Sequence, residues 1–411
     1  MSSGPAALAT GGFSGMEYQT ILLDPQSSSS TRMVFRIEAG RPFFAKRLRL
    51  CNFGLSNAVG NSDQVFFNHA GVYSLISKVS ITNLTGTEID HLSGSGIDGM
   101  MGIRLLQMPN SSEFSINRQL SQQMCNSIFC PSFSQTSLTE KLTSDDAARM
   151  GNSIYIDLAS MLTYLQARTV IDEGLTIIIE LKDASVLGYS YSFTRPPALA
   201  VDFCLDPSVK GDVGPEFGFS TIVDDRILLQ STPSFDRRLQ SFYNMYIRNF
   251  YYYNQGRSNN TLRLPLSRPN EKVEFQINGL KILPLKGIDS DAKKMAFLNS
   301  YAGKSSITHY ASYVDGVTAA EGLYNPNLGL KYSQLNTTNG STPTASALGA
   351  VFSYGCVRLD QAINADFTLS YGSDMTQGTG GVVDGDTLVM LAEVMRAYNK
   401  QTGLVRFVGQ M

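Results

Sequence analysis

The sequence predicts an all-β protein built from two similar halves, and three observations support that prediction. Short segments in which apolar and polar residues alternate recur along the chain, as expected of strands with one buried face. Turns rich in Gly, Asn and Asp separate these segments. Only 17% of the residues are charged, below the usual quarter, which disfavours disordered and coiled-coil proteins. Many short strands joined by such turns are typical of sandwiches and barrels.

Three segments, 75–82, 272–278 and 363–371, show the alternation most clearly. Their apolar faces consist of Leu75, Val79 and Ile81; of Val273, Phe275 and Ile277; and of Ile363, Ala365, Phe367, Leu369 and Tyr371. Lys, Glu, Gln, Asn, Asp, Ser and Thr side chains occupy the opposite faces. Further strands are predicted at 33–38, 153–158, 175–181, 198–205, 242–253 and 403–408.

Helix signals are few. Segment 290–303 has Ser290 as a candidate N-cap and Gly303 as a candidate end, and part of 150–166 also fits a helix. Segment 387–398 is ambiguous. Its apolar residues fit a helical face, yet it precedes a hairpin-like turn and a strand; these residues are Leu388, Leu391, Ala392 and Met395.

The strands fall into two sets, which predicts a first domain at 32–206 and a second at 207–411. Each half contains one long segment poor in strand signals, 93–150 in the first and 285–347 in the second. Insertions of that length usually form functional or contact surfaces. Residues 1–31 are rich in Gly, Ala and Ser and are predicted to be a flexible arm, because they have little apolar surface to bury.

The charge balance disfavours a nucleic-acid-binding protein. The chain has 33 Lys and Arg against 35 Asp and Glu, a net charge of −2, so the basic surface needed to bind phosphates is not expected. No apolar run approaches the roughly 20 residues of a membrane helix, and the N-terminus has no secretory signal pattern. We therefore expect a protein that is made inside the cell and does not enter a membrane.

No cofactor or metal site is predicted. The five cysteines form no CxxC pair and are expected to be buried, reduced thiols; they are Cys51, Cys125, Cys130, Cys204 and Cys356. The three histidines are too scattered to suggest a zinc site; they are His69, His91 and His309.

One glycine motif could indicate nucleotide binding. Gly94, Gly96 and Gly99 form a GxGxxG pattern, in which glycines let the backbone approach a pyrophosphate at a helix N-terminus. The helix candidate that follows must end by Pro109, and no second parallel strand comes after it. A glycine-rich loop is therefore favoured over a nucleotide site.

Other catalytic patterns are incomplete. Segment 302–305 resembles the end of a P-loop, but Leu298 occupies the position of the first glycine, so a helix C-terminus is the better interpretation. No GxSxG motif is present, and His91 is interpreted as a turn residue with its hydrogen bonds satisfied. Carboxylate pairs that a glycosidase could use are Asp145–Asp146, Asp224–Asp225 and Asp289 with Asp291. The absence of Trp disfavours a sugar-binding cleft, so no catalytic residue is predicted.

The C-terminal strands provide the most specific resemblance to a known family. In 350–372, Gly355, Arg358, Leu359 and Asp360 match a G-x-x-N-F-S-R-[IL]-D pattern followed by an alternating strand, although Cys-Val replaces part of the usual Asn-Phe-Ser. This pattern resembles that of double jelly-roll major capsid proteins of icosahedral double-stranded DNA viruses. The lineage includes adenovirus-like viruses, virophages, Polinton-like viruses, nucleocytoplasmic large DNA viruses and tailless bacteriophages.

Three further segments are similar to parts of the same family. Segment 71–90 resembles an early strand pair, and 158–183 resembles the segment leading into the strand that ends the first jelly roll. Segment 392–407 resembles the closing strand, turn and last strand, which favours a strand over a helix at 387–398.

The resemblance implies two eight-stranded antiparallel jelly rolls and a non-enzymatic role in the virion. It implies a homotrimer that forms a pseudo-hexameric capsomer and contacts neighbouring capsomers, penton proteins and minor capsid proteins. Assembly would take place in the host nucleus or cytoplasm. Two alternatives stay open at this point. One is a non-capsid β-sandwich adhesin or glycan-binding module, and the weaker one is a glycoside hydrolase.

Overall fold

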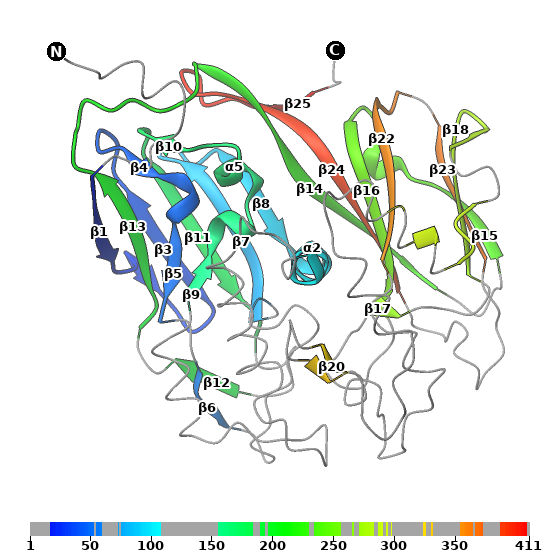
Figure 1. The fold of residues 1–411 in the computed structure, drawn as a ribbon, viewed down its shortest axis with the longest axis horizontal. Coiled ribbons are helices and arrows are strands. Elements are labelled where there is room, and N and C mark those ends of the chain that lie inside the picture. The colour runs from blue at the N-terminus through cyan, green and yellow to red at the C-terminus, as the bar shows by residue number, and fades with distance from the viewer. Residues whose placement is uncertain are drawn as a thin grey trace.

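The structure of the chain is a computed structural model. The structure describes residues 17–52, 55–59, 75–107, 155–183, 190–193, 196–229, 234–255, 265–266, 271–282, 287–290, 354–364, 366–372 and 387–408, together with a few shorter pieces between 73 and 331. Figure 1 shows two groups of strands side by side, with the long strands β14 and β24 running between them.

The first half of the chain contains two main antiparallel sheets. The six-stranded sheet consists of β1 (Tyr18–Leu23), β4 (Phe43–Phe44), β5 (Arg49–Cys51), β9 (Tyr155–Asp157), β10 (Val170–Ile171) and β13 (Ala198–Cys204). The five-stranded sheet consists of β2 (Ser27–Ser28), β3 (Arg32–Ile37), β7 (Ile76–Asn83), β8 (Glu88–Ser93) and β11 (Leu175–Leu181). A separate two-stranded antiparallel sheet consists of β6 (Leu55–Val59) and β12 (Ser190–Phe193).

The second half also contains two main antiparallel sheets. The six-stranded sheet consists of β14 (Glu216–Leu228), β16 (Tyr246–Gln255), β17 (Pro265–Leu266), β22 (Gly355–Ala362), β24 (Thr387–Asn399) and β25 (Val405–Phe407). The four-stranded sheet consists of β15 (Ser234–Arg238), β18 (Lys272–Ile277), β19 (Leu280–Lys281) and β23 (Phe367–Gly372). A short pair consists of β20 (Tyr324–Asn325) and β21 (Leu330–Lys331).

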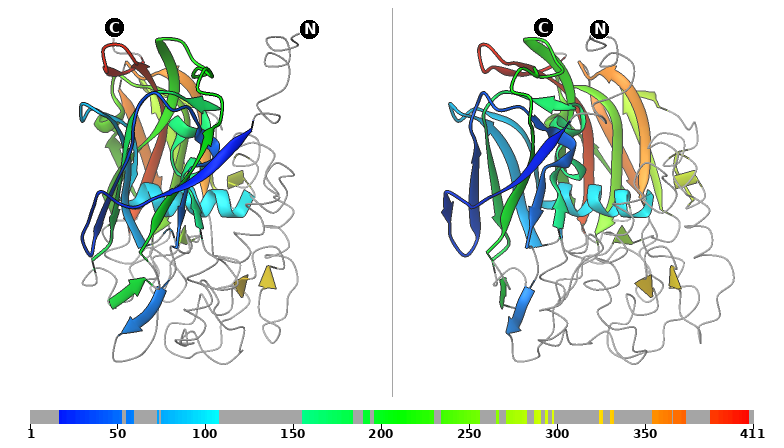
Figure 2. Two further views of the ribbon diagram at one scale, coloured as in Figure 1. Left: turned by 90° about the vertical axis from the view of Figure 1, so that its left-hand side faces the viewer. Right: turned by 60° about the vertical axis from the view of Figure 1, so that its left-hand side comes forward.

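Helices are short and few in the described part of the chain. They are α2 (Gly94–Gln107), α5 (Thr163–Gln166) and the 3₁₀ turns η2 (Ala45–Arg47), η7 (Leu158–Ser160) and η8 (Gln240–Phe242). Helix α2 lies between the two groups of strands (Figure 1) and runs crosswise to them (Figure 2).

The order of strand pairing identifies the fold of each half. In the first half the eight main strands, in chain order, are β1, β3, β5, β7, β8, β9, β11 and β13. In one sheet the first strand pairs with the eighth, the eighth with the third and the third with the sixth, which gives the order β1-β13-β5-β9. In the other sheet the second strand pairs with the seventh, the seventh with the fourth and the fourth with the fifth, which gives the order β3-β11-β7-β8. In the second half, β14, β15, β16, β18, β19, β22, β23 and β24 repeat this order. Eight strands shared in this way between two sheets make a jelly roll. The chain is a double jelly roll.

Burial follows the predicted alternation in the clearest strands. In β23, Phe367, Leu369 and Tyr371 are buried, and in β18, Val273 and Phe275 are buried. Ile363 is also buried, whereas Ile277 is half-buried at the end of its strand.

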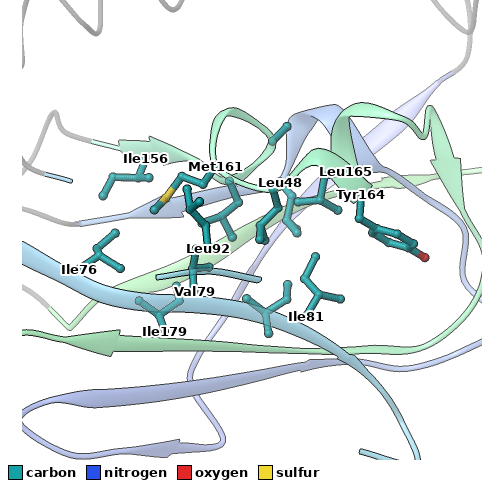
Figure 3. Packing of buried hydrophobic residues seen from close by; sticks show 14 of the residues in the cluster. Leu48, Ile76, Val79, Ile81, Leu92, Ile156, Met161, Tyr164, Leu165 and Ile179 are labelled. Carbon is teal, nitrogen blue, oxygen red and sulfur yellow. The ribbon is translucent and has the colours of Figure 1, made fainter. Parts of the chain in front are cut away.

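The core of the first jelly roll is packed in the same way. Val79 and Ile81 of β7 lie next to Ile179 of β11 and face Leu48 and Ile156 on the other side of the sandwich (Figure 3). All five side chains are fully buried.

Strand β24 explains why local pattern was ambiguous at 387–398. Val389 and Leu391 belong to the hydrophobic cluster that includes the first jelly roll, whereas Leu388, Met390 and Ala392 belong to the cluster inside the second. Both faces of this sheet are therefore covered, so the strand has no polar face and lacks the alternation of a half-exposed strand. The prediction of a strand there is confirmed.

The prediction of a flexible arm at 1–31 is wrong for the described residues 17–31. Residues 18–23 form β1, which pairs along its whole length with the buried strand β13, and Ser27–Ser28 pair with β3. The six-residue strand was hidden by its Gly- and Ser-rich surroundings, and its order comes from backbone pairing with a strand distant in sequence. The rest of the arm, 1–16, lies outside the described residues.

The helix predictions have mixed outcomes. Segment 150–166 yields β9, η7 and α5 rather than one helix. In 290–303, Lys293, Lys294 and Phe297 are helical, and Ser290 Oγ accepts a hydrogen bond from the Lys293 N–H at 3.4 Å, as expected of an N-cap. Gly303 lies outside the described residues.

Candidate functional site: the seam between the jelly rolls

A large hydrophobic contact joins the two jelly rolls, and we call it the seam. One continuous hydrophobic cluster contains Leu92, Ile97 and Tyr164 from the first half and Phe219 and Leu391 from the second. The ring centroids of Tyr164 and Phe219 lie 5.5 Å apart in an edge-on arrangement, which is favourable for aromatic pairs. The two halves therefore share a core, which makes them one packed unit.

The glycines of the GxGxxG pattern belong to the seam. They begin helix α2, and Gly94 has a left-handed backbone (φ +51°). A Cβ atom on Gly99 would lie 2.6 Å from Leu391 Cδ1 and 2.7 Å from Tyr253 Cε1. Glycine is needed there because the helix packs directly against the six-stranded sheet of the second jelly roll, to which Leu391 and Tyr253 belong. The predicted glycine-rich loop is in fact a helix, and close packing accounts for its glycines without a nucleotide.

A buried carboxylate stands at the centre of the seam. Asp90 on β8 accepts hydrogen bonds from Thr221 Oγ1 of the second half (2.6 Å), from the backbone N–H of Tyr164 (2.9 Å) and from Thr163 Oγ1 (3.3 Å). Burial raises the pKa of Asp90, and these hydrogen bonds partly oppose that effect. Arg396 of β24 lies close to this carboxylate and donates to the Ile89 carbonyl at 3.2 Å. These contacts supply hydrogen-bond partners for the buried Asp90 carboxylate and connect β8 to β14 and β24.

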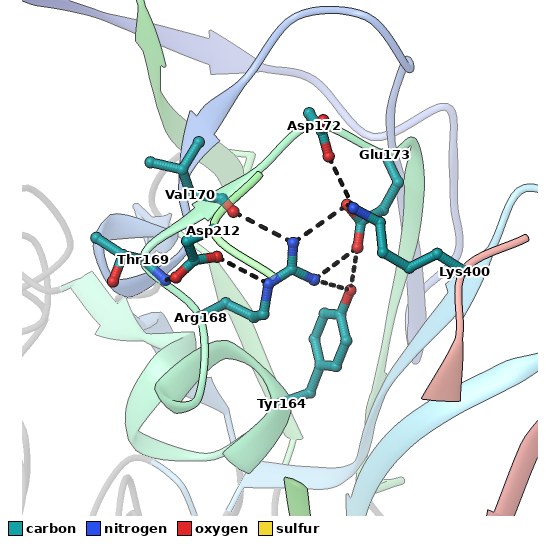
Figure 4. A network of polar contacts seen from close by, with 8 residues as sticks. All are labelled: Tyr164, Arg168, Thr169, Val170, Asp172, Glu173, Asp212 and Lys400. Atoms are coloured by element: carbon teal, nitrogen blue, oxygen red, sulfur yellow. Dashed lines mark hydrogen bonds and ion pairs between the residues drawn. The ribbon is translucent and has the colours of Figure 1, made fainter. Parts of the chain in front are cut away.

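A second polar network surrounds Arg168, whose side chain is fully buried (Figure 4). Its guanidinium lies 2.7 Å from Glu173 Oε1 and 3.0 Å from Asp212 Oδ1. It also donates to the Tyr164 hydroxyl at 3.1 Å and to the Val170 carbonyl at 3.2 Å. Each of these partners comes from the first half or from the link that follows it.

Lys400 of the second half extends this network across the seam. Its ammonium lies 3.0 Å from Asp172 Oδ1 and 3.2 Å from Glu173 Oε2. Burial raises the pKa of Asp172, but the N–H of Gly211 and the ammonium of Lys400 outweigh burial and bring the pKa down to about 2. Asp172 and Glu173, whose pKa is also lowered, are therefore held ionised at this end of the seam.

Smaller polar contacts join α2 to its surroundings. Ser95 Oγ donates to Asp224 Oδ2 of the second half at 2.8 Å, and the Tyr253 hydroxyl donates to the Ser95 carbonyl at 3.2 Å. Asp98 pairs with Lys182 at 3.4 Å. The polar residues within the GxGxxG segment thus act in packing the seam.

His91 is a strand residue of β8, not a turn residue as predicted. Its Nδ1 lies 2.8 Å from Glu88 Oε1, and Lys78 Nζ lies 2.7 Å from Glu88 Oε2. The hydrogen bond from His91 and the ammonium of Lys78 lower the pKa of Glu88 to about 2 against a smaller opposing effect of burial. His69 and His309 lie outside the described residues.

The described carboxylate pairs are engaged in structural contacts. Asp225 accepts from Ser241 Oγ at 2.7 Å, Asp224 accepts from Ser95, and Asp289 pairs with Lys293 at 2.5 Å. Three other candidates lie outside the described residues: Asp145, Asp146 and Asp291.

Cys51, Cys204 and Cys356 are free thiols in the described part of the chain, and burial raises the pKa of each of them. The described residues contain no group of three His, Cys, Asp or Glu side chains that could hold a metal ion. Among them there is also no helix long and apolar enough to cross a membrane. Cys125, Cys130 and the P-loop-like segment 302–305 fall outside.

No protein-family model matches the sequence, and no curated protein is similar to it. Three solved structures follow a similar course over most of the chain. The Sputnik virophage structure determined by cryo-EM has 11% identity and a TM-score of 0.49, and the alignment covers 96% of this chain and 89% of that one. The mavirus major capsid protein has 9% identity and a TM-score of 0.37, with 99% and 95% covered. A protein of Sulfolobus Turreted Icosahedral Virus has 10% identity and a TM-score of 0.39, with 92% and 90% covered.

The double jelly roll that the sequence resemblance implied is confirmed by the strand pairing of this chain itself. The seam was not found from the sequence. Arg168, Asp212 and Lys400 are far apart in sequence and belong to no motif, so only the folded chain brings them together. The one available signal was Gly99, a glycine inside a helix, which often marks close packing.

Proposed function

We propose that this chain is a major capsid protein that builds the icosahedral shell of a double-stranded DNA virus. The observation that carries the proposal is the repetition of one jelly-roll strand order in both halves, joined through a shared core. Jelly rolls are a common building unit of viral capsids. The role is also the one that the mavirus protein bears in its name.

The fused arrangement suits a shell subunit. Two similar units held rigidly side by side let three copies present six jelly rolls, which gives a pseudo-hexameric capsomer. The chain would then reside in the virion, with other capsomers, penton proteins and minor capsid proteins as partners. We place the boundary between the two domains at Asp206–Pro207, in the link between β13 and β14. Within segments 93–150 and 285–347, residues 94–107 form α2 in the seam and Ile288 belongs to the core of the second jelly roll. The rest of both segments is proposed to lie at the outer end of the capsomer and to meet around the threefold axis.

The role is proposed to be structural and not catalytic. The described polar residues that could suggest chemistry have structural partners: Ser95 bonds to Asp224 across the seam, and Asp98 pairs with Lys182 within the first half. Turnover of glycoside or ester substrates by the purified chain would contradict this part of the proposal.

The test is the mass and shape of the purified chain. Light scattering should give about three times the 44.9 kDa mass of the chain at micromolar concentration. Negative-stain images should show particles with a hexagonal outline. A stable monomer that binds a glycan saturably would overturn the capsid role in favour of a glycan-binding module.

A further inference from the structure

Strand β1 forms an uncharged outer edge of the first jelly roll. In the described structure it pairs with β13 alone, and it is the outermost strand of its group in Figure 1. Its sequence, YQTILL, contains no charged residue. Two of its apolar side chains point away from the core and are exposed, Tyr18 at 46% and Leu22 at 59%. The Tyr18 ring also carries the Arg47 guanidinium 4.6 Å from its centroid and meets Phe44 edge-on. An edge of this kind is a template for pairing with another strand.

Two other edge strands of the described sheets carry features that discourage such pairing. The edge strand β15 has exposed Asp236, Arg237 and Arg238. The edge strand β22 has a register shift and exposed Arg358, and its Asp360 has a left-handed backbone (φ 51°). Charges and bulges are common means of protecting a sheet edge. Strand β1 is six residues long and has neither.

The backbone phase of β1 can be fixed from one hydrogen bond. The Leu205 N–H donates to the Glu17 carbonyl at 3.1 Å, and these residues continue the β1–β13 register. Bonded and non-bonded pairs alternate along an antiparallel ladder. Residues 19, 21 and 23 therefore direct their backbone groups towards β13, whereas Tyr18, Thr20 and Leu22 direct theirs towards the open edge.

We propose that β1 pairs with β1 of a second copy of this chain, antiparallel and centred on Thr20. In this register Thr20 lies opposite Thr20 of the partner subunit, and Tyr18 lies opposite the partner's Leu22. Tyr18, Thr20 and Leu22, whose backbone groups point to the open edge, then lie opposite the same three positions of the other copy. Their backbone N–H and C=O groups can therefore form hydrogen bonds between the two strands. The two exposed apolar side chains cover each other on one face, and Thr–Thr and aromatic–aliphatic pairs are favourable across strands.

The second copy is the occupant that these features favour. A strand without charge does not repel its own copy, and its pattern of outward residues is symmetric about Thr20. The pairing joins two six-stranded sheets into one across a twofold axis. It concerns a contact between copies, goes beyond the proposed capsid role and does not depend on it. If the chain forms trimers, this contact links one trimer to the next.

Disulfide trapping tests the register. In Thr20→Cys the two thiols would sit on directly opposed residues about 5.5 Å apart at Cα, within the range that a disulfide bridges. Mild oxidation of the full-length chain at high micromolar concentration should convert most of this variant into a covalent dimer. Leu22→Cys is the matched control. It is on the same strand and face, but its copies would be four residues out of register and too far apart to bridge.

A charge substitution provides the second readout. Leu22→Lys places a lysine on the edge and should remove most of the dimer formed by Thr20→Cys, while the melting temperature stays close to that of the parent because Leu22 is largely exposed. Absence of a Thr20→Cys dimer, or an equal yield of dimer from Leu22→Cys, would overturn the proposal. So would a dimer that persists unchanged with Leu22→Lys.

Discussion

Removing the guanidinium of Arg168 should destabilise the chain far more than removing a surface guanidinium. Arg168→Met keeps much of the side-chain volume but takes away five hydrogen bonds, two of them to Glu173 and one each to Asp212, the Tyr164 hydroxyl and the Val170 carbonyl. Breaking a buried ion pair by removing one partner costs about 3–5 kcal/mol, because the other partner is left uncompensated. Since Lys400 still lies 3.2 Å from Glu173, we expect the lower end, about 3 kcal/mol.

Arg238→Met is the matched control. Arg238 pairs with Asp366 at 3.2 Å, but both side chains are more than half exposed, so the loss should stay within about 1 kcal/mol. Urea unfolding followed by tyrosine fluorescence measures both variants against the parent. The reasoning is refuted if Arg168→Met and Arg238→Met lower the unfolding midpoint equally. If Arg168→Met does not fold, a double-mutant cycle with Glu173→Gln under stabilising salt or osmolyte conditions still measures the coupling.

Four further predictions follow from the same structure. Phe367→Ala should cost about 3–5 kcal/mol through lost burial and a cavity, whereas the adjacent Thr368→Ala should stay near ±0.5 kcal/mol; melting temperatures of the pair check this. The free energy of unfolding should decrease as the pH is lowered from about 4.5 to 2, because the pKa values of Glu88 and Asp172 are about 2 in the folded chain against ordinary values of 4.5 and 3.8. The stabilisation from these two carboxylates is complete above the ordinary pKa values and is lost as the pH falls through about 2. Asp172→Asn should therefore flatten the dependence of the melting temperature on pH. Gly99→Val should lower the melting temperature by several degrees, since no space exists for its side chain, while a chain that tolerates it would contradict the close packing of α2. Calorimetry of the whole chain should show one main transition, because both jelly rolls contribute to one core; two well-separated transitions would show that the seam is weak.

Strands with one buried face could be predicted from the sequence because their chemistry repeats every two residues. Segments 175–181 and 272–278 illustrate this, since β11 and β18 coincide with them to within a residue. The same logic fails where both faces are buried, as in β24, and where a short strand is embedded in polar residues, as in β1. In the first case the alternation disappears, and in the second the strand depends on a partner about 180 residues away.

The seam could not be predicted because its parts have no local signature. Asp90, Thr221 and Arg396 come from three strands in two halves, and each alone resembles an ordinary strand residue. Their convergence has a physical consequence for assembly. The buried carboxylate of Asp90 is stable only while Thr221 and Arg396 of the second half stay in place, so a small rotation of one jelly roll against the other would leave it buried without these partners. The polar seam therefore favours a single relative orientation of the two jelly rolls more strongly than apolar packing alone would. The shell proposed for this chain would need that constraint, because any freedom between the two jelly rolls would be repeated at every contact between subunits.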